Sequence, residues 1–394
     1  MFVADLHNDL VQRVIEGEDV TKLTSHGHTD IPRLLKSEID LEILIIWVSS
    51  NSKEPNFFKR ADKMYDEIER ISSHEEIIIP KKLSDINEAI NNNKLMLPIS
   101  MEGGEGLEND INNLYHFIER GLFYFGPTWN HSLDWVSSNY DETYNSSKLK
   151  SHGLNEFGKE VISICQENNV LVDVSHIGEK SFWDIASIST QPFIASHSSV
   201  YNLCPHFRNL KDDQIEAIKQ VNGLIGINPY PFFIDKSFKE RETKERKKYL
   251  DELNSIERKY SNKTSQWIAK QNFLQKKLSD ICPSIEVFVD HIEYVINKIG
   301  IDYVGVGSDY DGLDCLPNKW NDCLDHMIIH ESLEKEFPKI ELNAGHDLNL
   351  ENLKFFLDKI NNIKEVSIGH ALICDTFEFG LQETIKKYLT LTNN

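Results

Sequence analysis

The feature that most constrains the fold of this chain is the alternation of short β-rich runs with longer amphipathic stretches. The stretches at 154–168 and 285–299 place apolar residues at helical spacing along one face. The β-rich runs occupy residues 2–7, 43–48, 95–100, 122–128, 170–176, 193–197, 223–228 and 303–309. Eight strands that alternate with helices predict an α/β fold, a parallel (β/α)8 TIM barrel. A doubly wound open sheet is the alternative, but no G-x-G-x-x-G follows any run and no Walker sequence occurs.

Two stretches exceed a minimal barrel. Residues 235–278, between the seventh and eighth runs, are dense in Lys and Glu. Their alternating charges predict an exposed helical excursion, which serves either as a lid or an oligomer contact, or as a solvated helix only. Residues 339–394 add two more strand-like runs, each leading into a helical pattern. We therefore expect a barrel domain over 1–335, which includes the excursion, and a tail of two βα units over 339–394.

Charge and cysteine usage exclude several classes of partner. The 63 acidic and 42 basic residues give a net charge of −21, which argues against nucleic acid and suits a divalent metal. No apolar run reaches the roughly 18 residues that a membrane helix needs, and the N-terminus has no signal-peptide pattern. Six scattered cysteines without a C-x-x-C pair predict reduced thiols. We expect a cytoplasmic protein with no membrane partner.

Residues that bind metals stand where the predicted strands end. The first strand carries His7 and Asp9, the third ends in Glu102, and the fifth and sixth end in His176 and His197. In a barrel these positions meet at the carboxyl end of the strands, where such folds keep their active sites. Three imidazoles and two carboxylates suit two divalent ions, with zinc as the default, and a shared hydroxide between them. The residue types therefore favour hydrolysis.

The eighth strand adds two further carboxylates at the same end of the barrel, Asp309 and Asp311. Asp311 is the weaker candidate, because it lies beyond the strand in the turn. His28 and Asp30 repeat the spacing of the first pair, but they fall between predicted elements and are interpreted as a loop pair. Isolated histidines, among them His206, are interpreted as surface or packing residues.

The combined motifs resemble the membrane (renal) dipeptidase family of zinc peptidases from residue 2 to about residue 330. The matching segments are DLHNDL, SMEGGEG, GPTWNHS, LVDVSHI, PFIASHSS, HFRNLKDDQI, GLIGIN and VDHIEYVINKIGIDYVGVGSDYDG. The resemblance implies a (β/α)8 barrel of the metal-dependent hydrolase type with two Zn²⁺ per chain. It also implies free dipeptides as substrates, a homodimer, and a cytoplasmic location as in bacterial relatives. By the same resemblance, His7 and Asp9 hold the first zinc, Glu102 bridges, and His176 with His197 holds the second.

Four further residues receive roles from this resemblance. Arg208 would bind the substrate carboxylate as a bidentate fork, with a structural salt bridge as the alternative. Asp309 would take a proton from the bridging water and give one to the leaving amine, as a catalytic residue beside Glu102. Tyr230 would line the substrate site or serve packing. Trp129 stands where the animal enzymes have a histidine that stabilises the oxyanion, which bears on substrate preference.

The tail resembles the last two βα units of pyridoxine 5′-phosphate synthase, through KIELNAGHDLNLENLKFF and KEVSIGHALICDTFEFGLQETIKKYL. In that family the corresponding histidine lies in the active site and the second turn binds phosphate, which points to His346, Gly369 and His370 here. The GGN motif that usually ends a dipeptidase of this family is absent. The earlier strands of the synthase are also absent, so we expect the tail to serve as packed structure, with a retained phosphate site as the alternative.

The leading hypothesis is therefore a binuclear zinc dipeptidase that uses a metal-bridging hydroxide. One alternative is another amidohydrolase, such as a deaminase or lactamase, on the same metal frame. A second alternative is a non-catalytic protein that binds a phosphate ester through the tail. Arg208 separates the first two hypotheses, because only a substrate with a carboxylate needs it.

Overall fold

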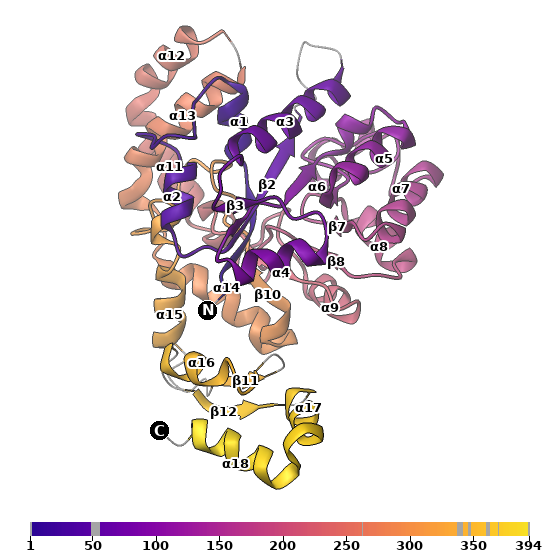
Figure 1. Cartoon of the computed structure of the whole chain (residues 1–394). Coiled ribbons are helices and arrows are strands. Elements are labelled where there is room, and N and C mark those ends of the chain that lie inside the picture. The colour runs from indigo at the N-terminus through magenta and orange to yellow at the C-terminus, as the bar shows by residue number, and fades with distance from the viewer. Residues whose placement is uncertain are drawn as a thin grey trace. The chain divides into compact units, whose positions relative to one another are not determined.

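Eight parallel strands lie side by side in a computed structural model of the chain, in the order β8-β7-β6-β5-β2-β1-β10-β9 (Figure 1). A parallel bridge between Ala195 and Ile225 joins the two ends of this order, so the sheet curls into a barrel. The strands are β1 (Ala4–Asn8), β2 (Leu41–Trp47), β5 (Ile99–Glu102), β6 (Leu122–Gly126), β7 (Leu171–Asp173), β8 (Phe193–Ile194), β9 (Ile225–Ile227) and β10 (Val304–Val306). The predicted (β/α)8 barrel is confirmed.

Helices follow most strands and surround the barrel (Figure 1). The two stretches predicted as helices form α7 (Glu156–Glu167) and α14 (Ile285–Ile299). Asn155 caps α7 by accepting a hydrogen bond from the backbone N–H of Gly158, and the apolar face of α7 is buried. The other helices around the barrel are α1 (Leu10–Ile15), α2 (Ile31–Lys36), α3 (Phe57–Ile71), α4 (Leu83–Asn91), α5 (Ile111–Arg120), α6 (Asn139–Tyr144), α8 (Glu179–Ile188) and α9 (Asp212–Gln220).

The third predicted strand is split in two. Its residues form β4 (Leu95–Met96), which pairs with β3 (Ile77–Ile78), and then β5. Pro98 lies at the break, where it has no N–H to donate, although its carbonyl still accepts a hydrogen bond from Leu44. The prediction of one continuous strand over 95–100 is therefore wrong in this detail, and the proline explains it.

The charged excursion forms a group of helices with a small core of its own. It contains α11 (Phe238–Arg246), α12 (Leu250–Lys259) and α13 (Lys263–Leu278), and the short helix α10 (Pro231–Ile234) directly precedes it. These helices bury Phe238, Leu253, Leu274 and Leu278 against Cys282 and Cys315. The excursion is thus anchored by apolar contacts to the segments that follow it, and it is more than a solvated helix. Short 3-10 turns complete the chain as η1 (Gly104–Leu107), η2 (Ser146–Lys148), η3 (Lys247–Tyr249), η4 (Ser279–Ile281), η5 (Ile301–Tyr303) and η6 (Cys323–Asp325).

The chain divides into two units, Phe2–Ile329 and His330–Asn394, and the structure describes residues 2–48, 56–261, 263–336, 342–345, 348–359, 363–368 and 370–392. The second unit contains a parallel pair, β11 (Leu342–Gly345) and β12 (Ile363–Ser367), each followed by a helix. Its helices are α16 (Leu353–Lys359), α17 (His370–Phe379) and α18 (Leu381–Thr392), while α15 (Ile328–Glu336) spans the division. Leu348, Leu353 and Tyr388 form its core.

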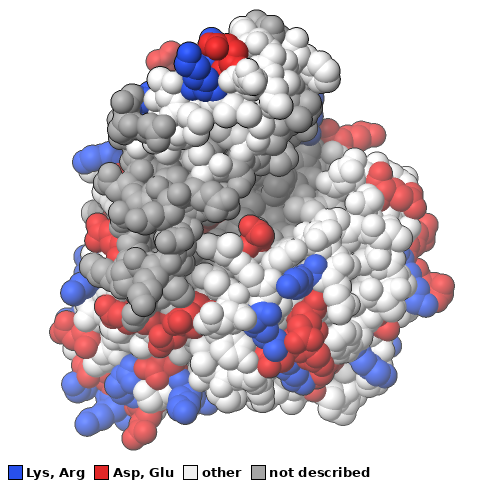
Figure 2. Space-filling view, turned by 90° about the horizontal axis from the view of Figure 1, so that it is seen from below, with Lys and Arg blue, Asp and Glu red and all other residues white. Residues whose placement is uncertain are grey.

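Charged side chains of both signs are intermixed on the face shown in Figure 2. No helix within the described ranges is long and apolar enough to cross a membrane. None of the six cysteines, all of which lie in the described ranges, forms a disulfide; five are buried and Cys374 is exposed.

Candidate metal and substrate site

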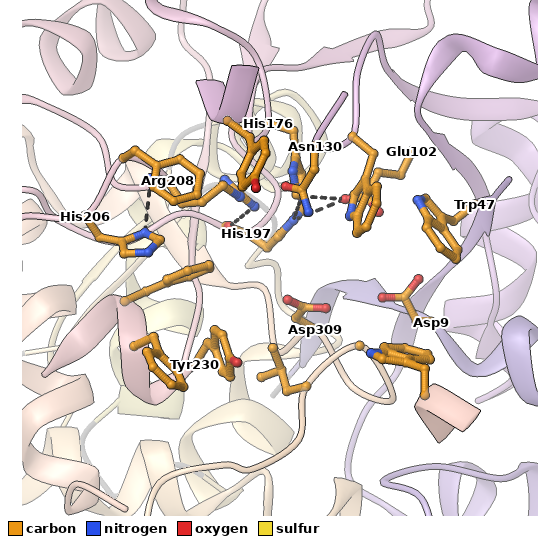
Figure 3. A pocket seen from close by; sticks show the side chains of 18 of the residues that line it. Asp9, Trp47, Glu102, Asn130, His176, His197, His206, Arg208, Tyr230 and Asp309 are labelled. Atoms are coloured by element: carbon orange, nitrogen blue, oxygen red, sulfur yellow. Dashed lines mark hydrogen bonds and ion pairs between the residues drawn. The ribbon is translucent and has the colours of Figure 1, made fainter. Parts of the chain in front are cut away.

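The five predicted metal ligands meet at the carboxyl ends of the barrel strands, and Figure 3 labels four of them, Asp9, Glu102, His176 and His197. His7 lies on β1 and Glu102 ends β5, whereas Asp9, His176 and His197 follow β1, β7 and β8. Asp9 is already beyond its strand, at the N-terminus of α1, and still turns its carboxylate toward His7. All five residues are buried. The barrel topology therefore brings together residues that are as many as 190 positions apart in the sequence.

Glu102 lies at the centre of this cluster. Its Oε1 atom is 2.9 Å from Nε2 of His176, 3.3 Å from Nε2 of His197 and 3.8 Å from Nε2 of His7. Nε2 of His7 is in turn 3.9 Å from Oδ2 of Asp9. One carboxylate oxygen thus faces three imidazole nitrogens, as a ligand shared by two metal ions would.

The protonation of the cluster fits a metal site. Burial, with Arg208 nearby, lowers the pKa of His7 to about 3, and burial lowers the pKa of both His176 and His197 well below the usual value. The rings are therefore neutral and keep lone pairs for a ligand. Nε2 of His7 and Oε1 of Glu102 are also buried without a hydrogen-bond partner. Buried polar atoms without a hydrogen-bond partner that converge on one point destabilise the fold, unless a cation binds between them.

A second layer of polar groups, which the sequence analysis missed, holds these rings in place. Nδ1 of His7 lies 2.7 Å from the hydroxyl of Tyr124, and Nδ1 of His197 lies 2.7 Å from the hydroxyl of Ser196. Ser196 donates to Oδ2 of Asp173 at 2.7 Å. The rings of His7 and His197 are thereby turned with Nε2 toward the cluster, the usual support for metal-binding histidines, whereas Nδ1 of His176 has no such partner among the described residues. The sequence pointed to this second layer through Tyr124 and Asp173, two polar residues inside otherwise apolar predicted strands.

Asp309 is brought to the same cluster by the turn that follows β10. Its backbone N–H donates to the carbonyl of His7 at 3.0 Å, and the N–H of Asp9 donates to the carbonyl of Tyr310 at 2.7 Å. Asp309 has a φ of 56°, the left-handed region that Asp tolerates better than most residues. Its Oδ2 accepts a hydrogen bond from the Asn228 side chain at 2.9 Å, while burial raises the pKa of Asp309 to about 6. Asp309 can therefore exchange a proton near neutral pH.

Gly312 allows two carboxylates to approach the backbone. A Cβ atom there would lie 2.0 Å from Oδ1 of Asp309 and 2.4 Å from Oδ2 of Asp9. Any side chain at this position would displace the two carboxylates. The glycine is thus part of what positions them.

Asp311 lies outside the cluster of candidate metal ligands. Its carboxylate pairs with Arg13 at 3.0 Å and accepts hydrogen bonds from the backbone N–H of His28 and the hydroxyl of Thr29. These contacts join the turn after β10 to the loop that precedes α2. The preference for Asp309 over Asp311 as the residue nearest the ligands agrees with this arrangement. His28 belongs to the same loop network, as the interpretation of a loop pair requires.

Arg208 is buried close to the histidines and lines the same cavity as they do. Nη1 donates to the carbonyl of Ser175 and to the hydroxyl of Ser198, and Nη2 donates to the carbonyl of His197 at 3.4 Å. Its hydrogen-bond acceptors among the described residues are thus neutral oxygens, and the carboxylates of Glu102, Asp309 and Asp173 act on its charge without an ion pair at 4 Å or less. A buried cation without a paired carboxylate favours an anionic ligand.

The cluster and Arg208 share one cavity of about 550 Å³. In Figure 3, Arg208 lies toward one end and Trp47 at the other, with His176, His197 and Glu102 between them. The rings of Trp47 and Trp129 meet edge to face, 4.7 Å apart. The rest of the lining comprises Asp9, Gln12, Asn130, Tyr140, His206, Phe207, Tyr230, Phe232, Phe233, Trp267, Asp309, Gly312 and Leu313.

Four lining residues bear on the sequence analysis. Trp129 and Tyr230 reach the cavity, as a substrate-lining role requires. Trp267, which α13 contributes, was missed, because a lone Trp in a Lys/Glu-rich segment gives no sign of where its helix packs. His206 was interpreted as a surface or packing residue, and instead it lines the cavity.

The tail candidates have no described site. His346 and Gly369 lie outside the described residues, and His370 begins α17 without a described side chain. Phosphate binding in this unit therefore stays a prediction from the sequence.

Comparison with known families yields two matches. The family model for membrane dipeptidase, peptidase family M19, matches residues 1–345. The model for the pyridoxal phosphate biosynthesis protein PdxJ matches residues 322–394.

Individual relatives agree with the first match. Dipeptidase 3 from Homo sapiens is 22% identical, with 97% of this chain and 70% of that protein aligned. A protein described as uncharacterized, from the PQQ-III 3′ region of Acinetobacter calcoaceticus, is 36% identical over 39% of this chain and 48% of its own length. The chain thus matches about half of the length of the second relative.

Solved structures share the fold. A metallopeptidase from Rhodobacter sphaeroides, liganded with a phosphinate mimic of the dipeptide L-Ala-D-Ala, is 21% identical with a TM-score of 0.66, covering 85% of this chain and 93% of its own. The probable dipeptidase PvdM from Pseudomonas aeruginosa is 19% identical with a TM-score of 0.67, covering 85% and 90%. Together with the family match over residues 1–345, the barrel and its cluster of ligands lead to one conclusion: this chain belongs to the membrane dipeptidase family, peptidase family M19.

Proposed function

We propose that this chain is a binuclear zinc dipeptidase that hydrolyses free dipeptides. The observation that carries the proposal is the position of Glu102, whose Oε1 faces the Nε2 atoms of three buried, neutral histidines. His7 and Asp9 would hold the first ion, Glu102 would bridge, and His176 and His197 would hold the second. Bound there, two zinc ions would polarise the substrate carbonyl and lower the pKa of a water molecule to about 7.

The remaining chemistry belongs to the side chains. Asp309, buried beside Asp9 with its pKa raised by burial, would take a proton from the attacking water. It would then return that proton to the leaving amine, so the carboxylate is regenerated in each cycle. Asn228 would hold Oδ2 of Asp309 in place through its 2.9 Å hydrogen bond.

Arg208 would select the length of the substrate. Its buried guanidinium lies in the same cavity as the ligand cluster, and a cavity of about 550 Å³ has room for a small ligand. A free dipeptide could place its C-terminal carboxylate on Arg208 while its peptide bond lies at the cluster. A longer peptide would place an uncharged amide at Arg208 and would leave the buried cation without an anion.

Hydrolysis of a panel of L,L and L,D dipeptides tests this proposal. We expect cleavage by the zinc-loaded protein, loss of cleavage after chelation, and recovery when zinc is added back. Glu102→Gln should bind less zinc in metal analysis and should lose activity with it. A folded, zinc-replete protein that cleaves no member of the panel would contradict the proposal.

We also propose that the protein works as a homodimer in a reducing compartment, the cytoplasm. The six cysteines support a reducing compartment, because none of them forms a disulfide in the described residues. The homodimer follows from family membership alone, and light scattering of the purified chain would test it.

A further inference from the structure

His206 forms part of the cavity wall directly beside Arg208 (Figure 3). The backbone N–H of Arg208 donates a hydrogen bond to Nδ1 of His206 at 3.3 Å. Because Nδ1 accepts this bond, the ring hydrogen must lie on Nε2. The imidazole therefore presents one N–H donor from its other side.

The ring has a fixed orientation and carries no charge. Phe207 and Phe233 pack against it, with ring centroids 4.4 Å and 4.7 Å away. Burial, with the cations Arg208 and Lys239 nearby, lowers the pKa of His206 to about 4. A neutral donor can stand next to Arg208 without repelling it, and the packed ring loses little freedom when a ligand binds.

Arg208 itself has few free donors. A guanidinium has five N–H groups, and the two on Nη1 are directed to the carbonyl of Ser175 and the hydroxyl of Ser198. One on Nη2 is directed to the carbonyl of His197. With the described residues as partners, the Nε hydrogen and one Nη2 hydrogen remain for a ligand. A carboxylate offers about four acceptor positions, so two donors leave part of it unsatisfied.

We propose that His206 is a further substrate-binding residue, which donates from Nε2 to the C-terminal carboxylate that Arg208 also binds. This inference rests on the proposed function, because it takes the ligand to be a free dipeptide. Arg208 then supplies the charge and His206 supplies an additional directed hydrogen bond. The pair forms an acid-specific subsite at the end of the cavity opposite Trp47.

Two variants distinguish the contribution of the Nε2 hydrogen bond of His206 from the contribution of its aromatic ring. His206→Phe keeps an aromatic ring for Phe207 and Phe233 but removes the donor, whereas His206→Gln removes the ring and keeps an amide N–H at similar reach. The ligands are a phosphinate mimic of a dipeptide and the same mimic as its C-terminal amide. Both are titrated calorimetrically into the zinc-loaded proteins, after metal content and melting temperature have been matched to the wild type.

We expect His206→Phe to weaken binding of the acid about tenfold or more, because a hydrogen bond to a charged group is lost. Binding of the amide should change by less than about twofold, and His206→Gln should recover most of the affinity for the acid. With a cleaved dipeptide, His206→Phe should raise KM and leave kcat near the wild-type value.

Equal weakening of acid and amide would show that His206 only supports the fold of the loop, and would overturn the inference. So would unchanged binding of the acid, or a wild type that does not prefer acid to amide. The titrations need no turnover. A protein that prefers the acid but cleaves no dipeptide would therefore contradict the proposed function and still decide the role of His206.

Discussion

The charged excursion, 235–278, and the C-terminal unit, His330–Asn394, both exceed a minimal barrel, but they are built differently. The excursion buries four of its apolar side chains against Cys282 and Cys315, and so it is tied to the unit Phe2–Ile329. The C-terminal unit instead gathers Leu348, Leu353 and Tyr388 into a core of its own. A few buried apolar side chains thus decide whether an added segment becomes part of the unit Phe2–Ile329. The density of charge on its surface does not decide this.

The same difference extends to the cavity. The excursion contributes Trp267 to the lining, and every described lining residue belongs to Phe2–Ile329. We therefore expect substitutions in the barrel and the excursion to change catalysis or specificity. Substitutions in the C-terminal unit should change local stability only. The following predictions test this contrast.

The largest effect should come from a matched pair of Asp→Asn substitutions, one in each unit. Asp309→Asn removes the group that moves the proton, and kcat should fall about 10²–10⁴-fold. Asp375→Asn alters a carboxylate that accepts a hydrogen bond from Tyr388 in the C-terminal unit, and kcat should not change. Steady-state kinetics with one dipeptide measures both. Comparable losses in the two variants would remove the contrast between the units.

Arg208→Ala should have the next largest effect. Loss of the buried guanidinium should cost roughly 2–4 kcal/mol of transition-state binding for a free dipeptide. A substrate without a C-terminal carboxylate should lose much less. The ratio of kcat/KM for dipeptide and dipeptide amide is the measurement. An equal loss for both substrates would favour another amidohydrolase activity on the same ligand frame.

Trp267→Ala should give a smaller, selective effect. Removing this ring should cost about 1 kcal/mol, or about fivefold in kcat/KM, for dipeptides with a bulky apolar side chain. Dipeptides of alanine and glycine should be less affected. Trp183→Ala is the matched control, because Trp183 on α8 is 38% exposed, close to the 36% of Trp267, but lies outside the cavity. If both variants behave alike, the excursion has no role in specificity.

The smallest effect should come from Tyr388→Phe. Its hydroxyl donates to Asp375 at 2.5 Å, and its loss should cost the C-terminal unit about 0.5–1.5 kcal/mol. Faster hydrogen exchange in α17 and α18, with unchanged exchange in the barrel strands, would show that only the C-terminal unit is destabilised. Faster exchange in β1 or β5 as well would mean that the two units unfold together.

Much of the barrel could be predicted, because its strands and helices carry local patterns. The apolar spacing in 154–168 and 285–299 located α7 and α14, and the β-rich runs located the eight barrel strands. Pro98 was visible in the sequence. Its effect on the third strand, however, depends on whether the neighbouring strand needs a backbone N–H or a carbonyl from this position.

That the five candidate ligands would lie together could be predicted for a similar reason. Parallel strands in a barrel end at one face, so metal-binding side chains at strand ends must meet. Tyr124 on β6 and Asp173 on β7 were missed although both lie on predicted strands, because their role depends on partners across the barrel. The place of His206 in the cavity wall was missed because it depends on contacts with Arg208, Phe207 and Phe233, and α10 contributes the last of these.

The sequence by itself determined the order of strands and helices, the residues that stand at the strand ends, and the family to which the chain belongs. Only the tertiary structure decided that Glu102 faces three imidazoles, that Trp267 reaches the cavity from a charged helix, and which donors of Arg208 remain free. The physical reason is the separation along the chain of the residues that interact. Periodicity along the chain reports which face of an element is buried, whereas hydrogen-bond partners and cavity walls depend on the register and packing of elements hundreds of residues apart.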